Sequence, residues 1–146
     1  MARVTASIDL PHPPDRVWRV ATRVADMPRW LPEVVEAELL DPELAAGSRI
    51  RLRLGPATGN AEITGTVAEL DPPRLVEISG HGGPLGVKVS TVLKPIGPGA
   101  TRVSLELELS TPPFLGFIAK EAERRINAEL PASLERFRVL LEAEPA

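Results

Sequence analysis

The feature that most constrains the fold is a single long amphipathic stretch at the C-terminal end of the chain. From Pro113 onward, apolar residues recur at helical steps, at Phe114, Ile118, Ile126, Leu130, Leu134, Phe137 and Leu141. This spacing predicts one long helix with an apolar face. Pro131 lies inside it and has no backbone N–H, so we expect a kink or a break near Asn127.

The rest of the chain consists mostly of short segments in which apolar and polar residues alternate. A period of two is typical of strands with one buried face. The predicted strands cover residues 4–10, 35–39, 50–54, 61–70, 75–79, 87–93 and 102–109, and turns rich in proline and glycine separate most of them. Residues 15–24 and 26–31 predict two short helices, the second capped by Asp26.

These elements predict an α+β domain spanning residues 1–146, with an ordered core over 1–142 and a tail over 143–146. Consecutive strands joined by short turns pair antiparallel. A sheet with one apolar face needs a cover, and only the C-terminal helix is long enough to supply it. We therefore expect a curved sheet of about seven strands wrapped around that helix.

Composition excludes several classes of site. The chain has no cysteine, which rules out disulfides and thiolate chemistry. His12 and His81 are far apart, and no carboxylate cluster has ligand spacing, so we expect neither a metal nor a cofactor. A net charge of −3 indicates no nucleic-acid partner. Without a signal-peptide pattern or a long apolar run, we expect a soluble cytoplasmic protein that does not insert stably into membranes.

Four stretches resemble a known family. They are IDLPHPPDRVWRVATRVADMPRWLPEV (8–34), GTVAELDPPRLVEI (65–78), GPGATRVSLELEL (97–109) and LERFRVLLE (134–142). This pattern resembles the START-like helix-grip superfamily, also called SRPBCC, which includes polyketide cyclases and dehydrases and lipid-transfer domains. The resemblance implies a helix-grip fold with a deep, mostly apolar pocket between the sheet and the terminal helix. It identifies no catalytic residue.

Three functions are compatible with this fold. The first is binding or transport of a small hydrophobic molecule, such as a lipid, an isoprenoid or a polyketide-like compound. The predicted lining consists of Trp18, Trp30, Ile50, Leu52, Ile63, Ile78, Val89, Leu105, Leu107, Phe114, Ile118 and Ile126. Of the two tryptophans, we expect Trp18 to anchor the first helix and Trp30 to border the mouth of the pocket.

The second function is a cyclase or dehydrase reaction in the same pocket. His81 is the best candidate for its proton-transfer group, because histidine titrates near neutral pH. The third is an interaction module, like the superfamily's co-chaperone or toxin-type members. An exposed patch around Phe114 and Phe117 would favour it, whereas packing of these rings against Trp30 is the default expectation. The chain is expected to be a monomer or a homodimer.

Several polar groups have two alternative placements. Arg49, Arg51 and Arg53 would face solvent and pair with acidic residues on neighbouring strands, unless a bulge turned one of them inward to hold a ligand carboxylate. Glu77 is solvated if Val76 faces the concave side of the sheet; Glu69 depends on the same choice of faces. The glycine-rich segment 80–86 is either a flexible lid or a plain hairpin.

Overall fold

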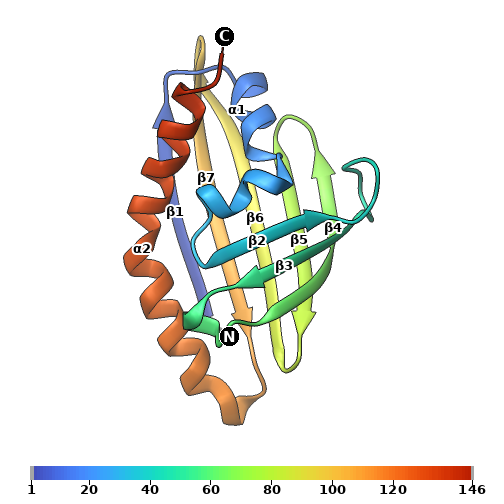
Figure 1. Cartoon of the computed structure of the whole chain (residues 1–146). Helices are drawn as coiled ribbons and strands as arrows, with labels where there is room; N and C mark the ends of the chain where they lie inside the picture. The colour runs from blue at the N-terminus through green and yellow to red at the C-terminus, as the bar shows by residue number, and fades with distance from the viewer. Residues whose placement is uncertain (1, 146) are drawn as a thin grey trace.

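The computed structural model describes residues 2–145 and shows a seven-stranded antiparallel sheet with a long C-terminal helix (Figure 1). The strands are β1 (Ala2–Leu10), β2 (Val34–Leu39), β3 (Arg49–Leu54), β4 (Glu62–Asp71), β5 (Leu75–Gly82), β6 (Leu85–Gly97) and β7 (Ala100–Ser110). The helices are α1 (Pro14–Ala21), the 3-10 turns η1 (Val24–Arg29), η2 (Pro56–Thr58) and η3 (Pro113–Leu115), and α2 (Gly116–Glu142). This architecture confirms the predicted helix-grip fold.

The order of the strands is β1-β7-β6-β5-β4-β3-β2, so β1 and β2 form the two edges of the sheet. The sheet curls, and β2 and β3 run across the direction of the long strands β5, β6 and β7 (Figure 1). Two facing glycines permit the tight approach between β4 and β5. A Cβ at Gly65 would lie 2.4 Å from the carbonyl oxygen of Ser79, and one at Gly80 would lie 2.6 Å from that of Thr64. Only glycine fits such a backbone contact.

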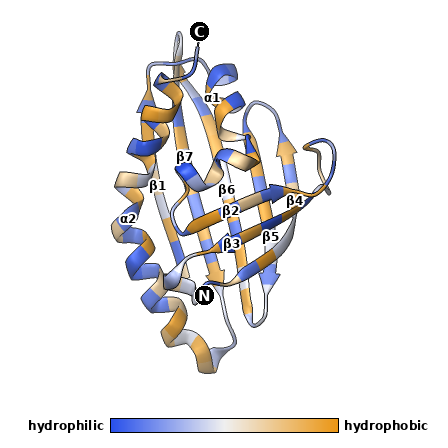
Figure 2. Cartoon of the chain, in the orientation of Figure 1, coloured by the Kyte–Doolittle hydropathy of each residue, from blue (hydrophilic) through white to orange (hydrophobic). Residues whose placement is uncertain are grey.

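The core lies between the concave face of the sheet and α2. Along β7, the side chains of Thr101, Val103, Leu105, Leu107 and Leu109 are buried, while the intervening residues are more exposed. Figure 2 shows the same alternation of hydrophobic and hydrophilic residues along the strands. α2 contributes Ile126, Leu130, Leu134, Phe137 and Leu141 to this core. The apolar faces that the strand and helix periods predicted therefore pack against each other in the fold.

The structure decides three local expectations. α2 runs without a break past Pro131, so the break expected there is wrong; one missing donor removes a single hydrogen bond from a helix whose other face is packed. Of the two alternatives for the segment 80–86, the plain hairpin is observed, since β5 continues to Gly82 and β6 begins at Leu85 with only a two-residue turn between them. The second short helix is a 3-10 turn, in which Asp26 lies in the first turn rather than at the cap.

The C-terminal end of α2 is tied to α1. Arg16 Nη2 donates to the carbonyl oxygens of Leu141 at 3.3 Å and Glu144 at 2.8 Å, and Arg23 forms an ion pair with the Glu144 carboxylate. The hydrogen bond from Arg23 lowers the pKa of Glu144 below its usual value of 4.5. Glu144, which belongs to the predicted tail, is thus held against α1 by side-chain contacts.

Candidate functional site

Most of the predicted pocket lining meets in one place, the space between the sheet and α2. Nine predicted residues are buried in a single hydrophobic cluster: Trp30, Ile50, Leu52, Ile63, Ile78, Val89, Leu105, Leu107 and Ile126. Trp18 is partly buried and packs against the same cluster. Phe114 and Ile118 do not reach it, since their side chains are 76% and 39% exposed.

A narrow gap lies between the first half of α2 and the strands β1 and β7. It is too narrow to admit a water molecule. Its lining consists of Ala2, Arg3, Val4, Leu107, Leu109, Glu123 and Ile126. Two members of the predicted lining, Leu107 and Ile126, therefore face each other across it.

The packing of α2 is uneven along its length. Its first half buries only Ala119, Ala122 and Ile126, whereas its second half buries Leu130, Leu134, Phe137 and Leu141 together with Ser133. Burial of apolar area stabilises by about 25 cal/mol per Å², and alanine has little area to bury. The half of α2 that borders the gap is therefore the more weakly held half.

Trp30 lies at the centre of the core, which corrects the expectation that it borders a pocket mouth. Its side chain is fully buried and packs on Phe137, with ring centroids 4.6 Å apart. The Ser133 hydroxyl donates to the Trp30 carbonyl oxygen. The indole Nε1 is buried and has no hydrogen-bond partner among the described residues. Buried indole N–H groups usually find an acceptor, so an unpaired one beside Phe137 is an exception in this core.

No titratable side chain is buried in the interior formed by residues 2–145. The buried polar residues are Ser48, Thr91, Thr101 and Ser133. His81, the candidate base, is exposed on the outward face of β5, opposite Gly86 and next to Lys88 in a shallow depression of about 180 Å³. Its position separates it from any ligand on the concave side, because successive strand residues point to opposite faces.

The charged side chains on the outward face of the sheet face solvent and pair across strands, which is the first of the two placements considered. Arg49, Arg51 and Arg53 pair with Asp41, Glu38 and Glu36 respectively. Val76 is buried on the concave side, and Glu77 on the other side accepts a hydrogen bond from Ser90 at 3.0 Å. Glu69 is also exposed. None of these groups reaches the interior.

Phe114 of η3 and Phe117 at the start of α2 are exposed instead of packing on Trp30, so the default expectation for these rings was wrong. They are 76% and 69% exposed. Figure 2 shows hydrophobic residues at the free lower end of α2, where the chain leaves β7. The exposed patch formed by Phe114, Phe117 and Ile118 lies beside the weakly packed half of the helix.

Sequence reasoning missed Phe137 and Ser133 as neighbours of Trp30. Phe137 was recognised as part of the apolar helical stripe, but nothing local indicates that its ring meets a tryptophan 107 positions earlier. Ser133 interrupts the same stripe. A small hydroxyl on the buried face of a helix was the available signal for a polar partner in the core.

Residues 2–145 contain neither a metal-binding cluster nor a candidate membrane-spanning helix. No group of three or more histidine and carboxylate side chains could hold a metal ion. None of the helices is both long and apolar enough to span a membrane.

Comparisons with known proteins place the chain in its family. Residues 1–142 match the family model described as "Polyketide cyclase / dehydrase and lipid transport". The Mycobacterium tuberculosis protein named Toxin Rv0910 is 27% identical over 139 residues, which cover 94% of this chain and 96% of that protein.

Solved structures share the fold at lower identity. The Zhui aromatase/cyclase from Streptomyces sp. R1128 has a TM-score of 0.77 at 17% identity, with 96% of this chain and 93% of that chain covered. A START superfamily protein from Mycobacterium smegmatis has a TM-score of 0.70 at 15% identity, covering 98% and 99% of the two chains. With the family model matching nearly the whole sequence, the chain belongs to the polyketide cyclase / dehydrase and lipid transport family, within the START-like (SRPBCC) superfamily.

Proposed function

We propose that the protein binds a small, elongated hydrophobic molecule between the sheet and the first half of α2. The observation that carries this proposal is the gap bordered by Leu107 and Ile126, whose lining is apolar except for Arg3 and Glu123. A ligand enters by displacing a helix segment that buries two alanines and Ile126, which loses less buried area than the second half of α2 would.

The chemistry of the interior limits the ligand. The aliphatic lining favours an acyl or isoprenoid chain over a flat aromatic molecule. The Trp30 indole N–H is not part of this gap, because its ring lies beside Phe137 in the second half of α2.

Binding is better supported than catalysis. A cyclase or dehydrase needs a group that moves a proton, typically a histidine or carboxylate within reach of the substrate. The buried polar groups of the described interior are hydroxyls and the Trp30 indole N–H, and His81 faces away from it. A reaction that depended on positioning alone would use the same lining residues.

The test is native mass spectrometry of gently purified protein, followed by titration with the fluorescent fatty acid cis-parinaric acid. We expect saturable binding. Ile126→Phe fills the gap and should weaken binding at least about tenfold, whereas Val139→Phe, on the exposed face of the same helix, should not. The proposal is refuted if the folded protein shows neither a bound small molecule nor saturable uptake, or if both variants bind like the wild type.

A second candidate function is binding to another protein through Phe114 and Phe117. Two strongly exposed phenylalanines at one helix end are unusual for a surface of this size. Two mycobacterial relatives at 27% identity carry the name toxin. A Phe114→Ser/Phe117→Ser variant that binds cis-parinaric acid normally but no longer binds a protein that the wild type binds would favour this candidate.

A further inference from the structure

Half of the large exposed apolar side chains gather at one end of α2. Within residues 2–145 these side chains are Val35, Ile96, Phe114, Phe117, Ile118 and Val139. Phe114, Phe117 and Ile118 form the exposed patch, and their spacing of three and four residues brings them together on one face of the turn from η3 into α2. The patch lies at a tip of the molecule, because the start of α2 extends beyond the ends of the strands (Figure 1).

The chain around the exposed patch carries no charged residue. The segment 110–119 and the turn 82–87 contain no aspartate, glutamate, lysine or arginine, although the chain has 17 basic and 20 acidic side chains. The two segments lie side by side, since Gly86 of β6 pairs with Ser110 at the end of β7. At this end of the molecule both segments therefore present only apolar and uncharged polar groups.

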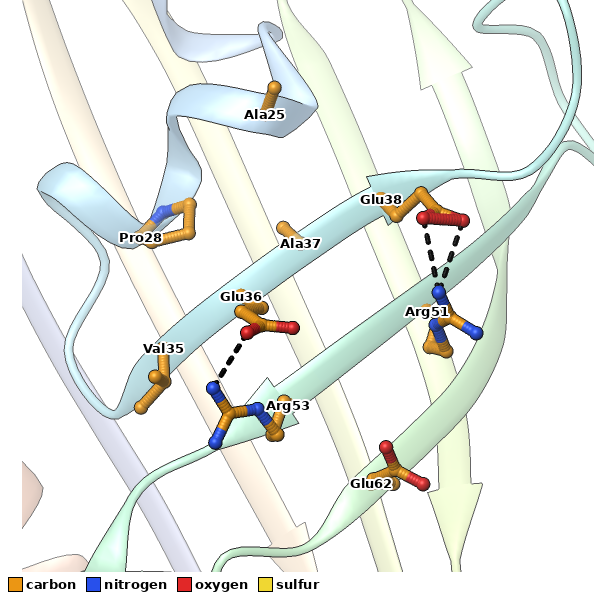
Figure 3. Close-up of a pocket in the computed structure, with 9 residues that line it drawn as sticks. All are labelled: Ala25, Pro28, Val35, Glu36, Ala37, Glu38, Arg51, Arg53 and Glu62. Atoms are coloured by element: carbon orange, nitrogen blue, oxygen red, sulfur yellow. Dashed lines mark hydrogen bonds and ion pairs between the residues drawn. The ribbon is translucent and has the colours of Figure 1, made fainter.

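Two other exposed apolar residues lie among charges. Val35 shares a hollow on the outward face of the sheet with Glu36 and Arg53, whose ion pair is drawn in Figure 3. Val139 follows Arg138, which pairs with two glutamates of α2. Transfer of either valine out of water would take charged groups with it, which is strongly unfavourable. The side chains of the exposed patch can leave water without this cost.

The size and shape of the exposed patch favour a lipid surface over a protein. The exposed fractions of its three side chains correspond to about 350 Å², if an aromatic residue has about 200 Å² to expose. A stable protein interface buries about 800 Å² on each partner and requires a matching surface. A bilayer accepts apolar side chains from a convex tip without a match in shape, and the affinity depends on the apolar area that enters it.

The same end of the molecule contains the gap beside the first half of α2. Ala2 and Leu109, which pair at the ends of β1 and β7, line this gap. Ile126 lines it from α2, between two and three helical turns after Phe117. A bilayer that holds the exposed patch therefore lies close to the gap.

We propose that Phe114, Phe117 and Ile118 insert into the surface of a lipid bilayer and dock the protein there reversibly, so that a hydrophobic ligand passes directly between the acyl chains and the gap. The docking is inferred from the exposed patch alone, whereas the passage of a ligand rests on the proposed function. Three side chains give shallow and weak binding, which suits a protein that loads its ligand and leaves.

The first probe is a vesicle of phosphatidylcholine, which has no net charge and does not repel a chain of net charge −3. Flotation measures how much of the full chain binds to the vesicles. The wild type should float with them, and Phe114→Ser/Phe117→Ser should lower its partition at least about tenfold because most of the inserted apolar area is lost. Val139→Ser removes an exposed apolar side chain from the other half of the same helix and is the matched control, which should float like the wild type.

A fluorescent label locates the contact, because the chain has no cysteine of its own. Gly116→Cys places an environment-sensitive label between the two phenylalanines, at a position where an added Cβ meets nothing within 4 Å. Its emission should rise and shift to the blue when vesicles are added. The same label on Val139→Cys should not respond.

Uptake of cis-parinaric acid separates docking from ligand binding. In solution, Phe114→Ser/Phe117→Ser should bind the fatty acid like the wild type, but it should take the fatty acid up from preloaded vesicles at least about tenfold more slowly. Equal uptake rates would overturn the proposed passage from the bilayer. A wild type that floats but binds no fatty acid in solution would refute the proposed function and leave docking supported.

Docking itself is overturned by any of four results. They are a folded wild type that does not float, a Phe114→Ser/Phe117→Ser variant that floats equally well, a silent label on Gly116→Cys, or self-association of the chain that buries the exposed patch. If the wild type ignores vesicles and the two phenylalanines are instead required for binding a protein, the occupant of the patch is that protein and not a bilayer.

Discussion

The ring of Trp30 packs on the ring of Phe137 with their centroids 4.6 Å apart and their planes inclined by 58°. Both side chains are completely buried, and they join the segment after η1 to the second half of α2. Tilted aromatic pairs contribute about 0.5–1.5 kcal/mol beyond their buried area. This contact lies in the half of α2 that buries the larger side chains, whereas the opposite half buries Ala119, Ala122 and Ile126.

The two tryptophans should differ in their effect on stability, in the order opposite to that suggested by the sequence. Trp30→Ala should lower the free energy of unfolding by about 3–5 kcal/mol, because it opens a large cavity against Phe137. Trp18→Ala should cost roughly 1–2 kcal/mol, since its ring is only partly buried. Urea denaturation followed by far-ultraviolet circular dichroism measures both. A larger loss for Trp18→Ala would contradict the assignment of Trp30 to the core.

The close approach of β4 and β5 should make Gly80 intolerant of a side chain. In Gly80→Ala the added Cβ would lie 2.7 Å from the Gly65 Cα and 2.6 Å from a backbone oxygen, so the strands must separate at a cost of about 1–3 kcal/mol or more. Gly116→Ala is the control. A Cβ there meets nothing within 4 Å, and alanine favours the helix by up to about 1 kcal/mol. Thermal unfolding should move in opposite directions for the two variants.

The link between α1 and the end of α2 should make stability depend on acid pH. The hydrogen bond from Arg23 lowers the pKa of Glu144 in the folded protein. A lowered pKa means that the contribution is fully present above the usual value of 4.5 and is lost as the pH falls through the lower, folded value. The difference in unfolding free energy between wild type and Glu144→Gln should therefore be greatest at neutral pH and shrink as the pH falls below 4.5. A constant difference for Glu144→Gln would rule out this account.

Pro131 should lower the stability of the folded protein relative to alanine at the same position in α2. Pro131→Ala supplies the missing N–H to an exposed stretch of an unbroken helix, and should raise the free energy of unfolding by about 1–3 kcal/mol. The reciprocal variant Ala128→Pro, on the exposed side of the same segment, should lower it by about 3 kcal/mol. Guanidinium denaturation gives both values. A fall in stability for Pro131→Ala would show that the surrounding packing requires the proline.

Fold and site differ in how far the sequence could predict them. The strands and α2 follow from period-two and helical spacing, and nine of the twelve residues chosen for the lining are buried in one cluster. The environments of Trp18, Trp30, Phe114 and Phe117 did not follow, because a large apolar side chain is equally compatible with a core, a pocket wall or an exposed patch. His81 was placed in a loop, and the hairpin that carries it turned its side chain outward.

By itself, the sequence determined which elements form, which face of each is apolar, and to which family the chain belongs, because these depend on local periodicity and on motifs. Only the tertiary structure decided how much space remains between the faces. That space depends on the close approach of β4 and β5 that Gly65 and Gly80 permit and on the packing of Trp30 against Phe137. It depends also on the small side chains buried by the first half of α2. Such contacts join residues far apart in the chain, and their fit is a property of the packed core and not of any single segment.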